Sequence, residues 1–346
     1  MKTLDKLTVP VIQGGMGVGI SMGNLAGAVA REGGMGVIST ANIGFREADF
    51  WSDPSAANHR ALAAEIEKAR QISGGNGLIA INAMVATSNY GEMVRYACEC
   101  GIDAVISGAG LPLELPELTK DYDVLIAPIV SSVKAAKMMN KVWTQRHGRR
   151  PDFFVVEGSQ AGGHLGFAQE ELEADRAKPL DALVAEVVKE AGDIPVFAAG
   201  SVFDGTDMTK VKAAGAFGVQ IGTRFIATEE CDATQTYKDM ILAAKPEDVM
   251  ILKSPVGMPG RGLRTALTQK VADGGKVQPE KCIGCIKMCN PIVTPYCISR
   301  ALIEGFYGNK EEGKHSGGFP SSSLFLAVLV HFCLYKVRVR NLLYYV

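Results

Sequence analysis

The sequence predicts an α/β fold in which eight short parallel strands alternate with helices and close into a (β/α)8 TIM barrel, followed by a smaller, mainly helical added segment. Two observations support this prediction. Eight short apolar runs recur at roughly regular intervals, with helical segments between them. Polar side chains and glycines gather directly after these runs, which is where such a barrel carries its catalytic and binding groups.

The apolar runs and the segments between them give the individual elements. The predicted strands are residues 9–13, 35–39, 78–84, 104–107, 124–128, 153–156, 195–199 and 218–221. The predicted helices are residues 24–32, 55–72, 90–100, 133–145, 180–191 and 207–214, and most of them are followed by glycine. A doubly wound dinucleotide-binding fold would also show strands alternating with helices. Its G-x-G-x-x-G spacing is absent from residues 15–19, so the barrel is preferred.

Composition narrows the class of protein. The chain has 346 residues, 47% of them hydrophobic, which is ample for a large core. The net charge of −1 gives no basic field for nucleic acid. The first residues contain no continuous apolar run, so we expect no secretory signal and no membrane partner. Eight cysteines in a chain of this length do not predict a disulfide scaffold, and a reducing cytoplasm is the expected setting.

The stretch DFFVVEGSQAGGHLG, residues 152–166, is the centre of the predicted site. A buried strand ends at Glu157, and four glycines and His164 follow it. Glycines at a strand end let the backbone approach a flat ligand closely, and His164 can change charge near neutral pH. The alternative interpretation is a glycine-rich turn with a hydrogen-bonded histidine.

The loops after the seventh and eighth strands have a specific interpretation. They contain Gly200-Ser201 and Gly222-Thr223. In barrels this pair of loops commonly binds a phosphate through backbone N–H groups. The alternative is two ordinary tight turns, but both follow a strand directly, so a phosphate-bearing ligand is preferred.

Several motifs in order along the chain resemble the nitronate monooxygenase family, formerly 2-nitropropane dioxygenases. The chain is also similar to the FMN-dependent enoyl-ACP reductases, which share that fold. The matching motifs are PVIQGGMGVGIS at 10–21, GLIAIN at 77–82, ISGAGLP at 106–112, APIVSS at 127–132, EGSQAGGHLG at 157–166, FAAGSVFD at 197–204, GVQIGTRF at 218–225 and KSPVGMPGR at 253–261.

The resemblance implies a non-covalent FMN in the barrel mouth and a role for each matched residue. His164 would face the substrate, and Gln160 stands where many relatives carry an acidic residue. The residues implied to contact FMN are Gly14, Gly15 and Met16 against the flavin, Asn82 beside it, Ala161, Gly162 and Gly163 along the ring, and Gly200, Ser201, Gly222 and Thr223 around the phosphate.

Three functions fit the resemblance. The first is oxidation of alkyl nitronates by molecular oxygen to a carbonyl compound and nitrite. The second is NAD(P)H-dependent reduction of an enoyl thioester or quinone through FMN. The third is a flavin-binding electron-transfer partner. In each enzymatic case the partner is a small molecule, nucleic acid is not expected, and a homodimer is left open.

The predicted barrel ends at residue 228, and residues 229–313 are expected to form a helical segment that covers the flavin. Within it the KSPVGMPGR loop brings Met258 and Pro259 to the substrate side. Four cysteines have the spacing C-x2-C-x3-C-x7-C, and thiolates so spaced can hold an iron–sulfur cluster or zinc. A group of reduced, buried cysteines without metal is the preferred interpretation. These cysteines are Cys282, Cys285, Cys289 and Cys297.

The tail, residues 314–346, departs from the rest of the chain. The apolar run 324–334 is about half as long as the roughly 20 residues that a membrane-spanning helix needs. The strings KVRVR and NLLYYV, residues 336–340 and 341–346, predict a strand rather than a closing helix. We interpret this end as divergent, and its sequence supports no inference about function.

Overall fold

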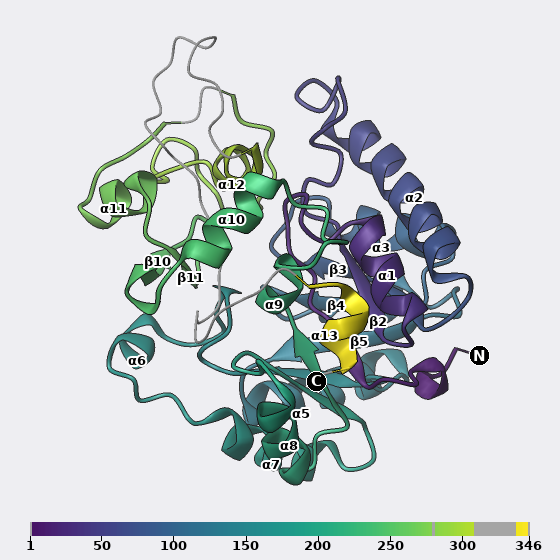
Figure 1. Ribbon diagram of the computed structural model, residues 1–346. Coiled ribbons are helices and arrows are strands. Elements are labelled where there is room, and N and C mark those ends of the chain that lie inside the picture. The colour runs from purple at the N-terminus through teal and green to yellow at the C-terminus, as the bar shows by residue number, and fades with distance from the viewer. Residues whose placement is uncertain (1, 279–280, 308–336, 345–346) are drawn as a thin grey trace.

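The computed structural model describes residues 2–278, 281–307 and 337–344, and at its centre is a closed parallel barrel (Figure 1). Its strand order is β1-β2-β3-β4-β5-β6-β8-β9, and β9 pairs with β1 to close it. The TIM-barrel prediction is confirmed. The barrel strands are β1 Val11–Gln13, β2 Met35–Ser39, β3 Leu78–Met84, β4 Ala104–Gly108, β5 Leu125–Val130, β6 Phe154–Glu157, β8 Val196–Ala199 and β9 Gly218–Ile221.

The barrel has two separate apolar layers because side chains alternate along each strand. Ile12, Val155 and Phe197 belong to the buried layer that fills the barrel interior. Val11 and Val156, one residue away on the same strands, belong to the outer core between strands and helices. The interior is therefore packed, and a ligand can bind only at the ends of the strands.

Helices surround the barrel and begin near the carboxyl ends of the strands. The Asp53 carboxylate caps α2, accepting from the amide of Ala56 at 3.1 Å, and Ser132 caps α5 in the same way. A Cβ at Gly27 would lie 2.7 Å from Ile72, so glycine allows α1 and α2 to pack closely. The helices with the barrel are α1 Gly23–Arg31, α2 Pro54–Ser73, α3 Tyr90–Glu99, α4 Leu115–Leu118, α5 Val133–His147, α6 Gln169–Glu173, α7 Leu180–Ala191, α8 Gly205–Ala213 and α9 Thr223–Ile226.

The elements from α10 to α12 gather on one side of the barrel in Figure 1 and combine helices with a hairpin. The two hairpin strands, β10 and β11, pair with β7, which comes from the glycine-rich stretch. The prediction of a loop over KSPVGMPGR is therefore wrong at its two ends, since Lys253 lies in β10 and residues 259–261 lie in β11. Only residues 254–258 form a tight turn, which folds β11 back onto β10. The elements are β7 Gly163–His164, α10 Gln235–Ala243, β10 Val249–Lys253, β11 Pro259–Leu263, α11 Ala266–Ala272 and α12 Ile298–Tyr307.

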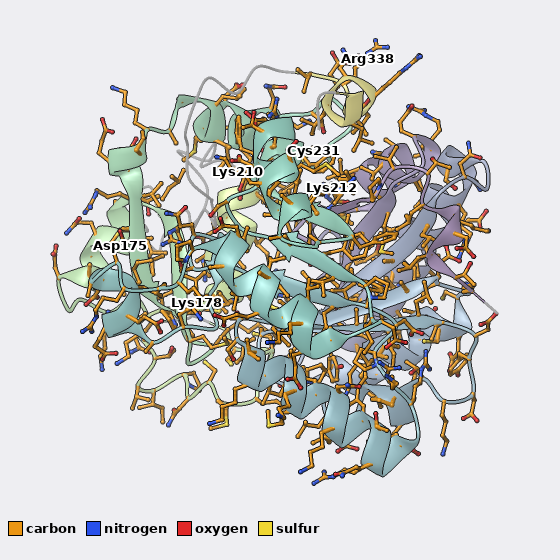
Figure 2. The ribbon with its side chains drawn as sticks, turned by 90° about the horizontal axis from the view of Figure 1, so that it is seen from below. Asp175, Lys178, Lys210, Lys212, Cys231 and Arg338 are labelled. Carbon is orange, nitrogen blue, oxygen red and sulfur yellow. The ribbon has the colours of Figure 1, made fainter. Side chains whose placement is uncertain are left out.

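The last described residues form a helix, α13 Val339–Tyr344, where the sequence predicted a strand. The correction follows from burial: Val339, Leu342 and Leu343 share one face of a helix and are buried near α1. Arg338, labelled in Figure 2, precedes this helix and forms an ion pair with Glu229. The apolar run 324–334 and most of the tail lie outside the described residues.

No helix in the described part of the chain is both long and apolar enough to cross a membrane.

Candidate functional site

A cavity of about 300 Å³ opens where the barrel strands end. It lies at the carboxyl ends of the strands, where barrels of this kind carry their active sites. Residues 283–286 and part of α12 form its outer wall. The predicted site residues that line it are Gly14, Gly15, Met16, Asn82, Ala161, Gly162, Gly163, His164, Gly200, Gly222 and Thr223.

The loop after β1 forms one wall of the cavity. A Cβ at Gly15 would lie 2.3 Å from the Cβ of Asn82, so only glycine lets this backbone and Asn82 share the wall. The buried Gln13 holds the loop from below: its amide donates to Ser21 Oγ at 2.8 Å, and its oxygen accepts from the amide of Val37 at 3.0 Å. Ser21 Oγ in turn accepts from the amide of Met16 at 2.9 Å. These hydrogen bonds hold the wall in place, and it presents mainly backbone to the cavity.

The loops after β8 and β9 form the second wall. Gly200 has φ +75°, and a Cβ there would lie 2.8 Å from Ala161. Gly222 differs, since a Cβ would meet only the Met16 side chain, at 3.5 Å or more. Ser201 is absent from the cavity lining, and its hydroxyl donates to Gln160 Oε1 at 2.9 Å. In this structure Ser201 therefore joins the loop after β8 to the loop after β6 through its side chain.

His164 lies in β7, on the cavity wall. Its strand is held by β11, where Gly260 pairs with His164 and the amide of Leu165 donates to Pro259 O at 2.8 Å. His164 Nε2 lies 2.8 Å from Ser254 Oγ, and burial lowers the pKa of the imidazole to about 4. His164 is thus a neutral imidazole at physiological pH.

Two contacts from the added segment to this stretch were missed by sequence analysis. Ser254 binds the imidazole, and Arg261 Nη1 donates to the carbonyl oxygens of Ser159 and Ala161. Both residues lie about a hundred positions from their partners, and only the pairing of β7 with β11 brings them together. The KSPVGMPGR motif contains both Ser254 and Arg261 and marked the segment as one that belongs to the site. Its sequence does not reveal that β11 pairs with β7.

Glu157 is a further residue of the cavity wall to which the sequence analysis gave no role. It ends β6, and burial raises the pKa of its carboxyl to about 8. Among the described residues, no hydrogen bond or ion pair engages this carboxyl. Glu157 is therefore mostly protonated and uncharged at neutral pH.

The four-cysteine group lies beside the cavity, and Cys285 lines it. The Ser299 hydroxyl donates to Cys285 Sγ at 2.9 Å, and burial raises the pKa values of Cys285 and Cys297. Cys282 is exposed and the other three are only half-buried, so the prediction that these cysteines are buried is wrong; none of the four forms a disulfide. Within the described residues, no three His, Cys, Asp or Glu side chains are placed to hold a metal ion.

The family described as nitronate monooxygenase matches residues 1–323 of the chain. A probable nitronate monooxygenase of Staphylococcus saprophyticus is 30% identical over 192 residues, which are 54% of this chain and 51% of that protein. A (3aS,4S,5R,7aS)-5-hydroxy-7a-methyl-1-oxo-octahydro-1H-indene-4-carboxyl-CoA dehydrogenase of Mycobacterium tuberculosis is 27% identical over 78% of this chain and 67% of that protein. The chain thus spans between about half and two thirds of the length of these relatives.

Two solved structures resemble the whole fold. FabK from Thermotoga maritima has a TM-score of 0.71 at 24% identity, covering 98% of this chain and 92% of its own. Nitroalkane oxidase from Streptomyces ansochromogenes has a TM-score of 0.72 at 19% identity, covering 99% and 95%. At these identities the likeness concerns the fold.

Proposed function

Since the chain belongs to the nitronate monooxygenase family, a family of flavin-dependent oxidoreductases, we propose that it binds FMN and oxidises alkyl nitronates with molecular oxygen. The products would be a carbonyl compound and nitrite. The observation that carries the proposal is one cavity wall that combines two glycine loops, after β8 and β9, with a neutral His164.

The cavity residues fit FMN. Backbone around Gly14, Gly15 and Gly162 lines it, and a flat ring can approach backbone closely where no Cβ intervenes. Gly222 and Thr223 directly follow β9, and the space around Gly222 is open except for the Met16 side chain, as a phosphate needs. In this assignment Asn82 hydrogen-bonds beside the flavin, while Gly200, Gly222 and Thr223 hold the phosphate. The side chain of Ser201 takes no part, since it binds Gln160.

FMN, when bound, would accept electrons from the nitronate and pass them to oxygen. Two nitronate anions and one dioxygen then give two carbonyl molecules and two nitrite ions, which balances atoms and charge. The protein's own part is to bind and orient the anion. A neutral His164 can donate a hydrogen bond to a nitronate oxygen, and the protonated Glu157 adds no negative charge that would repel the substrate.

The second candidate is NAD(P)H-dependent reduction of an enoyl thioester or a quinone. The extent of the cavity favours it, since the cavity runs past His164 to Ser88 and Asn89 after β3 and to Cys285 in the outer wall. A nitronate as small as ethylnitronate would leave that part unused. One of the similar proteins is, moreover, a dehydrogenase named for a CoA substrate.

Anaerobic flavin reduction separates the candidates. Purified protein is reconstituted with FMN and mixed, without oxygen, with ethylnitronate or with NADH and NADPH. Bleaching by nitronate alone, followed by oxygen uptake and one nitrite per carbonyl product, supports the proposal. Bleaching by NADH or NADPH but not by nitronate would support the reductase instead. If none of these compounds bleaches the flavin, an electron-transfer protein is favoured. Mass spectrometry of the heat-released cofactor must find FMN; FAD or no flavin would contradict the assignment of the cavity.

A further inference from the structure

Three side chains from distant parts of the sequence form a hydrogen-bonded chain at the cavity wall. Ser254 Oγ lies 2.8 Å from His164 Nε2 and accepts from the amide of Val256 at 3.2 Å. Burial raises the pKa of the Tyr296 hydroxyl, and the neighbouring Ser254 hydroxyl lowers it through a side-chain hydrogen bond. Ser254 and Tyr296 are 7% and 3% exposed, so their hydrogen bonds are shielded from water.

The number of hydrogens available fixes the direction of this chain. A serine hydroxyl has one hydrogen and two lone pairs. The Val256 amide occupies one lone pair. If Ser254 donated to Tyr296, the phenol hydrogen would be buried without an acceptor among the described contacts. If Tyr296 donates to Ser254, every hydrogen has an acceptor, and the hydroxyl hydrogen of Ser254 is left for His164 Nε2. Buried hydrogen-bonding groups are satisfied in the great majority of cases, which selects the second arrangement.

We infer that Tyr296 and Ser254 fix the tautomer of His164: Tyr296 donates to Ser254, Ser254 donates to Nε2, and the imidazole carries its single proton on Nδ1. No hydrogen bond among the described residues uses Nδ1, and His164 lines the cavity. Nδ1–H is therefore the hydrogen-bond donor that a molecule in the cavity meets. Ser254 and Tyr296 are positioning residues that act through His164.

This tautomer has a consequence for the class of substrate, and that consequence rests on the proposed function. A neutral nitroalkane must lose a proton from carbon before it becomes a nitronate, and the proton needs a lone pair to accept it. On His164 the Nε2 lone pair is occupied by Ser254, and Nδ1 already carries a proton. The other titratable groups in the described lining are Glu157 and Cys285, and burial keeps both protonated near neutral pH. The site therefore takes a substrate that arrives as an anion.

Nitrogen-15 NMR of histidine-labelled protein tests the tautomer without any assay of activity. The His164 signals are assigned by their loss in His164→Gln. Between about pH 5.5 and 7.5 they should show a neutral ring with the proton on Nδ1 throughout, whereas an ordinary histidine titrates near 6.5. A proton on Nε2, or a titration inside that range, would overturn the inference even if nitronate oxidation is established. The NMR measurement tests the tautomer independently of the proposed function, even if nitronate is not a substrate.

Variants test the positioning roles. In Ser254→Ala, Nε2 loses its donor, so the NMR signals should shift toward the Nε2–H tautomer or a mixture, and kcat/KM for nitronate should fall about tenfold. Tyr296→Phe removes the hydrogen that orients Ser254 and should produce a smaller shift of the same sign. Ser73→Ala and Tyr122→Phe make matched changes away from the cavity lining and should leave the spectrum unchanged. An unchanged His164 spectrum in folded Ser254→Ala would refute the chain.

A comparison of neutral and anionic substrates tests whether the site contains a base. At about pH 7, neutral nitroethane should bleach the flavin no faster than nitronate forms from it in buffer, while pre-formed ethylnitronate should bleach it directly. A faster reaction with nitroethane, slowed by deuterium on the reacting carbon, would show that the site holds a base and would overturn the inference.

Discussion

Arg261 Nη1 donates to the carbonyl oxygen of Ala161 at 2.9 Å, although the two residues are 100 positions apart. The same nitrogen also donates to Ser159 O, so one guanidinium fixes two carbonyls of the stretch that lines the cavity. Burial lowers the pKa of this guanidinium but leaves it charged. The added segment thus holds in place the stretch that ends in His164.

Replacing Arg261 should weaken FMN binding. In Arg261→Met the carbonyls of Ser159 and Ala161 lose a charged donor, and hydrogen bonds to charged groups contribute about 1.5–3 kcal/mol. The stretch should become mobile, and the Kd for FMN, measured by flavin fluorescence, should rise at least about tenfold. Arg150→Met is the control, because Arg150 forms an exposed ion pair with Asp193. Equal FMN affinity in the wild type and Arg261→Met would show that the contact does not order the site.

Gly222→Val tests the phosphate position. Gly222 has φ −109°, which any residue adopts, and the nearest atom to an added Cβ is Met16 Sδ at 3.5 Å. The FMN-free variant should therefore unfold within about 1 kcal/mol of the wild type. Its side chain would enter the space assigned to the phosphate, so the Kd for FMN should rise by about tenfold or more, with Gly222→Ala intermediate. Wild-type affinity in Gly222→Val would place the phosphate elsewhere.

Glu157→Gln should change the response of the protein to alkaline pH. The carboxyl has a pKa of about 8 in the folded protein against an ordinary 4.5. The unfolded chain releases this proton first, so its contribution to stability is present below 4.5 and is lost as pH rises toward 8. The FMN-free Gln variant lacks this loss and should gain stability relative to the wild type between about pH 5 and 8 in urea unfolding. A constant stability difference across that range would contradict the raised pKa.

Much of the site could be predicted because it lies where local signals are strong. Strand ends, glycines and His164 all fall within short stretches whose apolar pattern is clear, and the barrel then brings them to one face. Ser254, Arg261 and Tyr296 could not be predicted in the same way. The contacts of Ser254 and Arg261 depend on β7, a strand of two residues, pairing with β11, and so short a strand has no periodicity to detect.

In the tail a local sequence pattern was present but predicted the wrong element. The alternation in KVRVR is a strand pattern, yet residues 339–344 form a helix. Val339, Leu342 and Leu343 are spaced for one helical face, and burial near α1 decides between the two patterns. Tertiary packing overrides a local pattern when the stretch is only six residues long.

His164→Ala should keep the fold and FMN but change catalysis in a way that reports the role of the imidazole. With its pKa lowered to about 4, His164 is neutral in the folded protein, while the unfolded chain protonates below 6.5. Its contribution to stability is therefore present above 6.5 and is lost as pH falls toward 4, and the Ala variant should be relatively less sensitive to acid. After correction for ionisation of the substrate, kcat/KM should not fall on the acid side between about pH 5 and 7 because of His164.

If proton transfer by His164 were limiting, the Ala variant would lose about 10²–10⁴ in turnover. As a donor to an anion it should instead lose about tenfold to a hundredfold with pre-formed nitronate, largely in KM. Stopped-flow flavin reduction and steady-state oxygen uptake distinguish these outcomes, and unchanged kinetics on every competent substrate would make His164 a purely structural residue.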